Sequence, residues 1–207
     1  MAAQGSTIVE AQVYDFGFRT LNVKTIVVQL SLDQIFEAAK HSQFIASDAG
    51  FPEGRQVKPE KRNSELSTTT WNLSSDIKFL DVSALEGSVI ELTQPFEFIR
   101  YPVGGFFKKH TDRKRYPEHT HTLCIYPPQD CVCGDLELLS VSMQFDKVVN
   151  TIKTSPYLWK VVIFPVSLEH QISPVVQGTK YLFKTPITLH LTKEQVRVIK
   201  SRKGMCD

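Results

Sequence analysis

The chain has 207 residues, of which 42% are hydrophobic and 22% are charged, and its formal net charge is +2. This length suffices for one compact domain with a sizeable core, and the composition is ordinary for a globular protein. So small a net charge does not by itself indicate a nucleic-acid or membrane partner. No stretch approaches the ~18 continuous apolar residues of a membrane span, and the N-terminus lacks the pattern of a signal peptide. We therefore expect no membrane partner and a cytoplasmic or, alternatively, nuclear location.

The four cysteines fit that expectation. They are Cys124, Cys131, Cys133 and Cys206. Without a secretory signal we expect them to be reduced thiols. The pair Cys131 and Cys133 has the wrong spacing for the common zinc motif, and no second Cys/His pair lies nearby, so we expect no zinc site there.

The first part of the chain mixes strand, helix and loop signals. Residues 1–18 have the composition of a loosely attached lead-in. The β-branched segment Val23–Leu30 predicts a strand. Ser31 is a good N-cap for a helix over Leu32–His41, which carries apolar residues on one face. Residues 46–75 are rich in Gly, Pro, Ser, Thr and charge, which predicts a long loop of the kind that often serves as a lid or binding loop.

After that loop the pattern becomes mainly β. Short apolar runs are separated by Gly and Pro turn residues, which is typical of a sandwich or small barrel. The predicted strands are Ile77–Val82, Ser88–Leu92, Phe96–Tyr101, Thr120–Tyr126, Leu136–Phe145, Lys160–Phe164, His170–Ile172 and Thr179–Phe183. The last segment, Thr192–Lys203, predicts a basic surface helix or tail.

A candidate metal site follows from two histidines and one carboxylate. His110 and Asp112 are two residues apart, so in an extended segment their side chains point to the same side. His170 begins a later strand and supplies a second imidazole. Two neutral nitrogens and one anionic oxygen hold Fe(II) while leaving coordination positions open. Lys180 adds a cation that can hold an acidic cosubstrate.

Other histidines provide weaker signals. His119 and His121 share the two-residue spacing, but no carboxylate completes a ligand set at short range. His41 and His190 have no companions, and we expect structural roles for them. A His-x-Asp pair alone is also common by chance, so the assignment of a metal site depends on the surrounding sequence.

That surrounding sequence resembles the prolyl 4-hydroxylase-like 2-oxoglutarate/Fe(II)-dependent dioxygenases. The family signature Y-x-x-G-x-x-(aromatic)-x-x-H-x-D is matched by Tyr101, Gly104, Phe107, His110 and Asp112. The C-terminal signature H-x-V-x-P-V-x-x-G-x-(R/K) is similar to the segment from His170 to Lys180. The segment from Cys133 to Leu136 is similar to the family's G-G-x-L turn, with cysteine in place of the first glycine. The match covers residues 96–186.

The resemblance implies a mainly β fold with flanking helices and a double-stranded β-helix, or jelly-roll, core. The chain would be a single domain over residues 1–207. Residues 1–95 would provide the supporting helix and strand and the substrate-side loop, residues 96–190 the catalytic core, and residues 191–207 the basic helix or tail.

The resemblance also assigns roles. His110, Asp112 and His170 would bind Fe(II). Lys180 would pair with the distal carboxylate of 2-oxoglutarate, and Tyr126 would donate a hydrogen bond to the same carboxylate. Tyr101 would line the pocket beside the metal-bound end of the cosubstrate. Lysine keeps the charge of an arginine but not its bidentate fork.

The implied activity is hydroxylation of a C–H bond by an oxidoreductase that consumes 2-oxoglutarate and O2 and releases succinate and CO2, with ascorbate as the reductant. The expected substrate is a protein or peptide, at a prolyl or related residue. Three alternatives stay open: a nucleic-acid oxygenase, a small-molecule oxygenase and a non-catalytic jelly-roll binding module.

One basic run beside the metal candidates is explained by no family rule. Arg113, Lys114 and Arg115 directly follow Asp112. They form either a solvated loop, the usual fate of a charge cluster, or an anchor for an acidic substrate.

Overall fold

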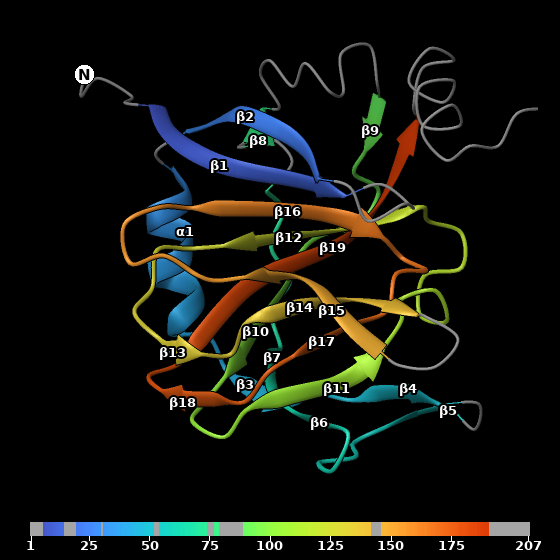
Figure 1. Cartoon of the computed structure of the whole chain (residues 1–207). Coiled ribbons are helices and arrows are strands. Elements are labelled where there is room, and N and C mark those ends of the chain that lie inside the picture. The colour runs from blue at the N-terminus through green and yellow to red at the C-terminus, as the bar shows by residue number, and fades with distance from the viewer. Residues whose placement is uncertain are drawn as a thin grey trace, which may run out of the picture.

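The computed structural model describes residues 6–14, 20–29, 31–51, 54–73, 77–78, 89–141 and 146–190 (Figure 1). Within these ranges it has one helix, α1 (Ser31–Lys40), and 19 strands. The strands before the predicted core are β1 (Ser6–Tyr14), β2 (Thr20–Gln29), β3 (Phe44–Ala46), β4 (Ala49–Phe51), β5 (Gly54–Gln56), β6 (Arg62–Asn63), β7 (Glu65–Ser67), β8 (Ile77–Lys78) and β9 (Val89–Glu91). Those of the core region are β10 (Glu97–Tyr101), β11 (Phe106–His110), β12 (His121–Tyr126), β13 (Val132–Cys133), β14 (Leu136–Val141), β15 (Asp146–Ile152), β16 (Lys160–Pro165), β17 (His170–Ile172), β18 (Val175–Gln177) and β19 (Lys180–His190).

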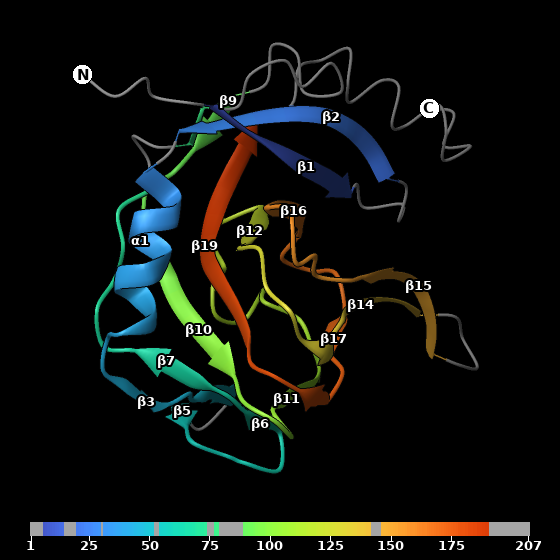
Figure 2. The same cartoon turned by 90° about the vertical axis from the view of Figure 1, so that its left-hand side faces the viewer.

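Two main sheets form the molecule. The larger has ten strands, nine of them in the order β3-β7-β10-β19-β12-β16-β1-β2-β8, with β9 paired to β19. The smaller has the order β15-β14-β17-β11-β6. The pairing is antiparallel except between β1 and β16. Figure 2 shows α1 on one side of β10 and β19, with β14, β15 and β17 of the smaller sheet on the other side. This arrangement is the predicted mainly β jelly-roll core with a flanking helix.

Strand alternation divides the core into two clusters. On β12, Leu123 and Ile125 belong to the cluster that includes α1, whereas Cys124 and Tyr126 belong to the cluster between the two sheets. The strands β16, β10 and β19 alternate in the same way. Successive side chains of a strand point to opposite faces, so both faces of the larger sheet are buried at these four strands. Each fully buried aliphatic or aromatic side chain contributes roughly 1.5–3 kcal/mol.

Helix α1 packs against the larger sheet through its apolar face. Leu32, Phe36 and Ala39, spaced three and four apart, are buried against the larger sheet (Figure 2). The Trp159 indole Nε1 donates a hydrogen bond of 2.9 Å to Asp33 Oδ1, which attaches the first turn of α1 to the residue preceding β16. The predicted helix from Ser31 is thus confirmed.

Two predictions for the N-terminal half were wrong. Residues 6–14 are not a loose lead-in but strand β1, which pairs with β2 on one side and β16 on the other. Residues 46–75 are not one continuous loop, because they contain β4 to β7. Strand β6 pairs with β11, and β7 pairs with β10 and β3. Such strands of two or three residues form by pairing with distant segments and have little local signal.

The predicted strands of the core are found with shifts at their ends. The largest difference is β19, which runs to His190, beyond the predicted end at Phe183. Strands β11, β13, β15 and β18 were not predicted. Residues 79–82 and 142–145 and the predicted helix Thr192–Lys203 lie outside the described residues. Among the residues that are described, the helix is too short and too polar to cross a membrane.

Candidate metal centre and adjoining pockets

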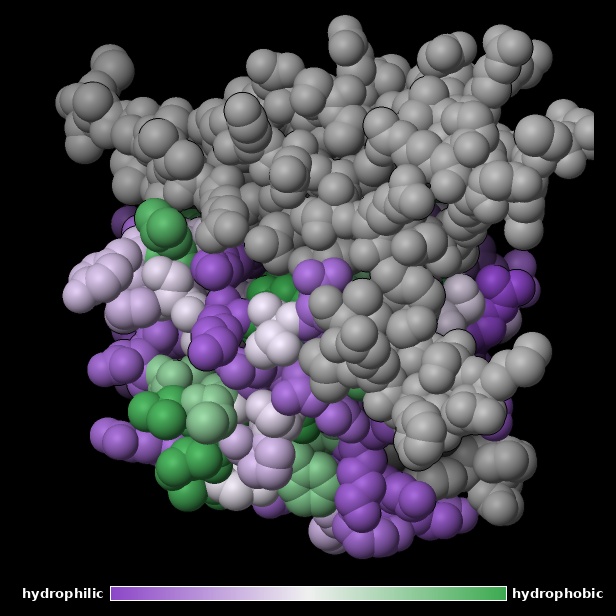
Figure 3. Space-filling model, in the orientation of Figure 1, coloured by the Kyte–Doolittle hydropathy of each residue, from purple (hydrophilic) through white to green (hydrophobic). Residues whose placement is uncertain are grey.

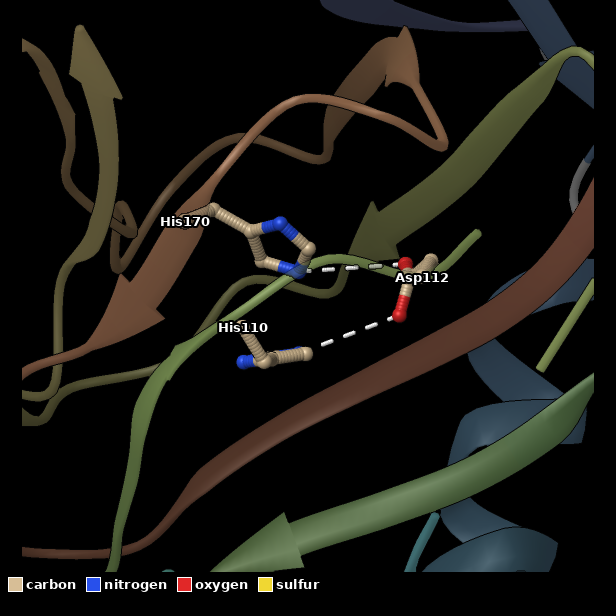
Figure 4. Close-up of side chains that lie close together, drawn as sticks. All are labelled: His110, Asp112 and His170. Carbon is tan, nitrogen blue, oxygen red and sulfur yellow. Dashed lines mark ion pairs between the residues drawn. The ribbon is translucent and has the colours of Figure 1, made fainter. Parts of the chain in front are cut away.

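Three of the predicted ligands lie together at one end of the smaller sheet. His110 is the last residue of β11, Asp112 follows two residues later, and His170 is the first residue of β17. The antiparallel register places His110 directly opposite His170. One candidate ligand atom from each of the three residues lies within 4.8 Å of the others. Figure 4 shows both imidazoles directed toward the Asp112 carboxylate.

Backbone hydrogen bonds orient both imidazole rings. His110 Nδ1 is 2.8 Å from the carbonyl oxygen of Lys108, and His170 Nδ1 is 2.9 Å from that of Leu168. An Nδ1–H donating to these carbonyls leaves each Nε2 with a lone pair. Each Nε2 lies 3.8 Å from one oxygen of Asp112. Burial lowers the pKa of both histidines, so both are neutral and able to ligate.

The Asp112 carboxylate is buried and accepts a hydrogen bond on each oxygen. Lys184 Nζ donates to Oδ1 and Thr122 Oγ1 donates to Oδ2, both at 2.7 Å. Burial by itself would raise the pKa of this carboxyl. The Lys184 ammonium is the largest opposing effect, and the pKa is held well below its usual range. In turn Asp112 raises the pKa of Lys184 against the opposing effect of burial. Asp112 is therefore an anion held in one orientation.

This donor set fits a divalent cation. The buried Nε2 of His110 has no hydrogen-bond partner among the described residues, so a polar atom is directed into the centre and left unsatisfied. Native proteins rarely leave such atoms unpaired without a ligand or functional reason. Two neutral nitrogens and one carboxylate oxygen on a single side match the ligand type of non-haem Fe(II) and leave other positions open.

A narrow inner pocket lies on one side of the ligands. Tyr101 and Tyr126 line it, whereas Lys180 lies beside it and is not part of its lining. Lys180, Tyr126 and Tyr101 are all buried. The Lys180 ammonium donates a hydrogen bond to the Gly134 carbonyl and lies 4.7 Å from the centroid of the Tyr126 ring. The Tyr126 hydroxyl is buried and has no partner among the described residues. The pocket lining is otherwise mostly apolar and includes Ile99, Cys124, Leu136, Phe164, Ile172 and Leu182.

Burial shifts the ionisation of both Lys180 and Tyr126. It lowers the pKa of Lys180 to about 8 and raises the pKa of Tyr126 well above its ordinary value. The ammonium is thus a desolvated cation with no carboxylate partner among the described residues, and the phenol is a neutral hydrogen-bond donor. Together they could hold one anionic group.

The turn before β14 supports Lys180. Gly134 has φ +72°, and a Cβ there would lie 2.7 Å from Val175 Cγ2 and 3.4 Å from Lys180 Cδ. Its neighbour Cys133, at the position where the family turn has glycine, also has positive φ, at 64°. The turn therefore keeps the left-handed geometry, although a non-glycine residue occupies that conformation at a cost of roughly 1–2 kcal/mol.

A wider outer cavity of about 350 Å³ opens on the other side of the ligands. Most of its side chains are charged. They are Asp48, Lys61, Arg62, Lys108, Lys109, Asp112, Lys114, Arg115, Glu169 and Lys184, joined by Phe107, His110 and Thr111. Arg62, Phe107, His110 and Lys184 line both spaces, so they form the boundary between them.

The other histidines take no part in this centre. His119 Nε2 lies 3.2 Å from Thr93 Oγ1, and His121 Nδ1 lies 2.8 Å from Thr120 Oγ1. His190 lies at the end of β19 and is paired with Glu91. Within the described part of the chain, His110, Asp112 and His170 form the one cluster of metal-ligand type.

Sequence reasoning missed Lys184 and Thr122. Lys184 lies four residues after Lys180 on β19, and Thr122 lies four residues before Tyr126 on β12. Residues separated by four on a strand share a face, so this periodicity was the available signal. This spacing indicates that Lys184 and Thr122 share a face with Lys180 and Tyr126, but it does not indicate that they contact Asp112.

Comparison with known proteins gives a likeness in structure. No family model matches the sequence, and no curated protein matches it. A solved oxidoreductase of the 2OG-Fe(II) oxygenase family from Burkholderia pseudomallei matches with a TM-score of 0.50 and 10% identity, over 76% of this chain and 78% of that one. A prolyl hydroxylase from Trichoplax adhaerens, solved with a hypoxia inducible factor oxygen degradation domain peptide fragment, matches with a TM-score of 0.50 and 17% identity, over 81% and 79%. Likeness at such identities concerns the fold alone. The chain therefore has the fold of the 2OG-Fe(II) oxygenases and prolyl hydroxylases.

Proposed function

We propose that this protein is an Fe(II)- and 2-oxoglutarate-dependent dioxygenase that hydroxylates a C–H bond of a peptide, at a prolyl or related residue. One observation carries the proposal. A cluster of His110, Asp112 and His170 lies beside a pocket lined by Tyr126, whose buried hydroxyl is unsatisfied. The buried Lys180 ammonium, which has no carboxylate partner among the described residues, lies next to the Tyr126 ring. A metal and a dicarboxylate would satisfy all of these groups.

The three ligands would hold ferrous iron through two imidazole Nε2 atoms and the Asp112 carboxylate. The backbone carbonyls at Lys108 and Leu168 fix the rings, and Thr122 fixes the carboxylate. Outer hydrogen bonds of this kind set ligand orientation and basicity. When bound, the iron supplies the activation of dioxygen that hydroxylation needs.

Lys180 and Tyr126 would bind the distal carboxylate of 2-oxoglutarate. The ammonium forms a charge-assisted hydrogen bond, which is strong in a buried site, and the Tyr126 hydroxyl donates a second. Tyr101 lines the same pocket and would flank the end of the cosubstrate nearer the ligands. The apolar lining excludes water and so strengthens these contacts. This fixed position would present the keto acid to the metal in one orientation.

The shape of the outer cavity supports a peptide substrate. Buried Asp112 and Arg62 lie in its lining together with exposed Lys61 and Lys114, so the cavity extends from the ligands to the surface. An open mouth suits a residue presented on a chain, whereas a metabolite is usually enclosed on most sides. The Trichoplax adhaerens structure was solved with a peptide.

The test is turnover of the cosubstrate. The protein is incubated with Fe(II), ascorbate, O2 and 2-oxoglutarate, and succinate is measured with and without added peptide. We expect uncoupled succinate formation that requires Fe(II) and is absent in His110→Ala. Absence of both succinate formation and 2-oxoglutarate binding would refute the proposal and favour a binding module.

A further inference from the structure

The outer cavity concentrates positive charge. Its lining has seven lysine or arginine side chains and three carboxylates, an excess of four positive charges, whereas the whole chain has a net charge of only +2. A ferrous ion and a doubly ionised 2-oxoglutarate would cancel in formal charge. The excess therefore persists when the proposed metal and cosubstrate are bound, and it faces whatever enters the cavity.

Part of this charge is neutralised within the protein. Lys184 is paired with Asp112, Arg115 with Glu97 and Asp48, and Lys109 lies 4.0 Å from Glu169. The cations that form no ion pair with a described carboxylate are Lys61, Arg62, Lys108 and Lys114. The three lysines are exposed, so each alone is an ordinary surface charge.

Arg62 is different because its side chain is buried. Only 6% of the residue is exposed. Its Nε donates to Ser64 Oγ at 2.7 Å, one Nη donates to the Asp48 carbonyl oxygen at 3.0 Å, and the guanidinium lies 4.6 Å from the centroid of the Phe107 ring. A buried charge without a counter-ion is strongly unfavourable. The guanidinium has five N–H donors, and these two contacts leave the others free beside the cavity.

We propose that the outer cavity binds acidic side chains of a polypeptide, with one carboxylate on the Arg62 guanidinium and flanking carboxylates on Lys61, Lys108 and Lys114. This proposal rests on the function proposed above and specifies its substrate as an acidic peptide. The planar fork of arginine fits a carboxylate with two parallel hydrogen bonds. The three lysines are exposed parts of the cavity lining, so they attract a negatively charged segment and hold it more weakly than Arg62 does.

The cavity does not offer what single-stranded nucleic acid needs. Base stacking requires free aromatic faces. The single aromatic ring in the cavity lining is Phe107, which is stacked on His110 with 3.5 Å between centroids and lies under the Arg62 guanidinium. Both faces of the ring are thus occupied. Of the basic run after Asp112, Lys114 is the residue that contributes an unpaired cation to the cavity, since Arg115 is paired.

The experiment measures binding and needs no turnover. Fluorescence anisotropy is recorded for a short labelled peptide that alternates glutamate with alanine around a central proline, and for its glutamine counterpart. The protein is loaded with Mn(II) and saturating 2-oxoglutarate, so that the inner pocket is filled. We expect the glutamate peptide to bind roughly tenfold or more tightly than the glutamine peptide, and its affinity to fall as salt rises.

Variants locate the site. Arg62→Met and the triple variant Lys61→Ala/Lys108→Ala/Lys114→Ala should each weaken binding of the glutamate peptide by roughly tenfold. Lys153→Ala is the matched control, because Lys153 is exposed and lies outside the cavity lining, and it should bind as the wild type does. The triple variant changes only exposed side chains and keeps the test valid if Arg62→Met does not fold.

Several results would overturn the proposal. They are equal binding of the two peptides, wild-type binding by the cavity variants, tighter binding of a labelled single-stranded oligonucleotide, or loss of peptide binding when 2-oxoglutarate is added. Loss of peptide binding on addition of 2-oxoglutarate would indicate that Arg62 binds the cosubstrate instead. Succinate formation without cavity-dependent peptide binding would refute this inference alone, whereas cavity-dependent peptide binding without 2-oxoglutarate binding would refute the proposed oxygenase function alone.

Discussion

The two spaces on either side of the metal ligands use positive charge in opposite ways. The inner pocket has a mostly apolar lining, and its two lining cations, Arg62 and Lys184, lie on the boundary with the outer cavity. Beside the Tyr126 ring of this pocket lies one fully buried cation, Lys180. The outer cavity has seven cations, most of them exposed or paired. One desolvated charge binds one anion strongly and with fixed geometry, whereas many solvated charges attract a variable anion with weak individual contacts. The inner pocket is thus suited to a constant cosubstrate and the outer cavity to a variable chain.

Removing a metal ligand should have the largest effect, because it affects both spaces. We expect His110→Ala to weaken binding of Mn(II), measured by calorimetric titration, by more than the roughly 10- to 100-fold that loss of an outer-sphere partner costs. His119→Ala is the control, since His119 contacts Thr93 and not the cluster. Equal metal affinity in the two variants would remove His110 from the site.

The next largest effect should be confined to the inner pocket. Lys180→Met keeps an unbranched side chain that is one atom shorter and removes the charge. We expect the dissociation constant for 2-oxoglutarate to rise roughly 10- to 100-fold, which is the value of a charge-assisted hydrogen bond, while Mn(II) affinity stays unchanged. Loss of the metal in this variant would instead indicate a structural role for Lys180 and would break the distinction between the two spaces.

The inner pocket should also be more sensitive to pH. Since burial lowers the pKa of Lys180 to about 8, Lys180 without a bound anion is an ammonium below that pH and a neutral amine above it. Affinity for 2-oxoglutarate should therefore fall as pH rises through about 8, approaching tenfold per pH unit. Lys180→Arg stays charged throughout and should show a flat profile in the same titration. Parallel profiles for the two proteins would contradict this origin of the pH dependence.

At the boundary between the spaces, Lys184 should oppose metal binding. Its ammonium lies 2.7 Å from Asp112 Oδ1 and competes with a cation for that oxygen. We expect Lys184→Met to bind Mn(II) roughly tenfold more tightly, from Coulomb repulsion at an intermediate dielectric. The metal-free variant should melt at a lower temperature, because Asp112 loses its partner. Weaker metal binding would mean that Lys184 instead positions the carboxylate for the metal.

The smallest effect should come from the turn that supports Lys180. Cys133 has φ 64°, so Cys133→Gly removes the strain of a left-handed side chain. We expect the free energy of unfolding to rise by about 1 kcal/mol, measured in denaturant. Binding of 2-oxoglutarate and of the glutamate peptide should not change. Destabilisation would show that the Cys133 side chain makes a contact worth more than the backbone strain.

Prediction from the sequence succeeded where the signal was local. The spacing of Leu32, Phe36 and Ala39 predicts the helix, and the long apolar runs predict β12 and β16. The sequence failed for β6, since this strand depends on a partner more than forty residues away, Phe106–Phe107. It also failed for β1, which pairs with the adjacent β2 on one edge and with the distant Lys160–Ile163 on the other. Local composition carries no information about such pairing.

The same distinction holds for the site. His110, Asp112, His170 and Lys180 were predicted because their spacing forms a recurring pattern, and the fold brings the three ligands together. Lys184 and the buried state of Arg62 were not predicted. Lys184 is 72 residues from Asp112, and the burial of Arg62 follows from the pairing of β6 with β11. The Lys184–Asp112 contact and the burial of Arg62 both depend on tertiary contacts, which local sequence patterns do not reveal.

Binding of 2-oxoglutarate tests the central claim most directly. The titration is performed by calorimetry on the Mn(II)-loaded protein, the metal-free protein and Lys180→Met. The account predicts tight binding to the loaded wild type, much weaker binding without metal, and weak binding to the loaded variant, because the ligands and Lys180 hold opposite ends of one molecule. Equal affinity in all three samples, or no binding in any, would contradict the assignment of this site.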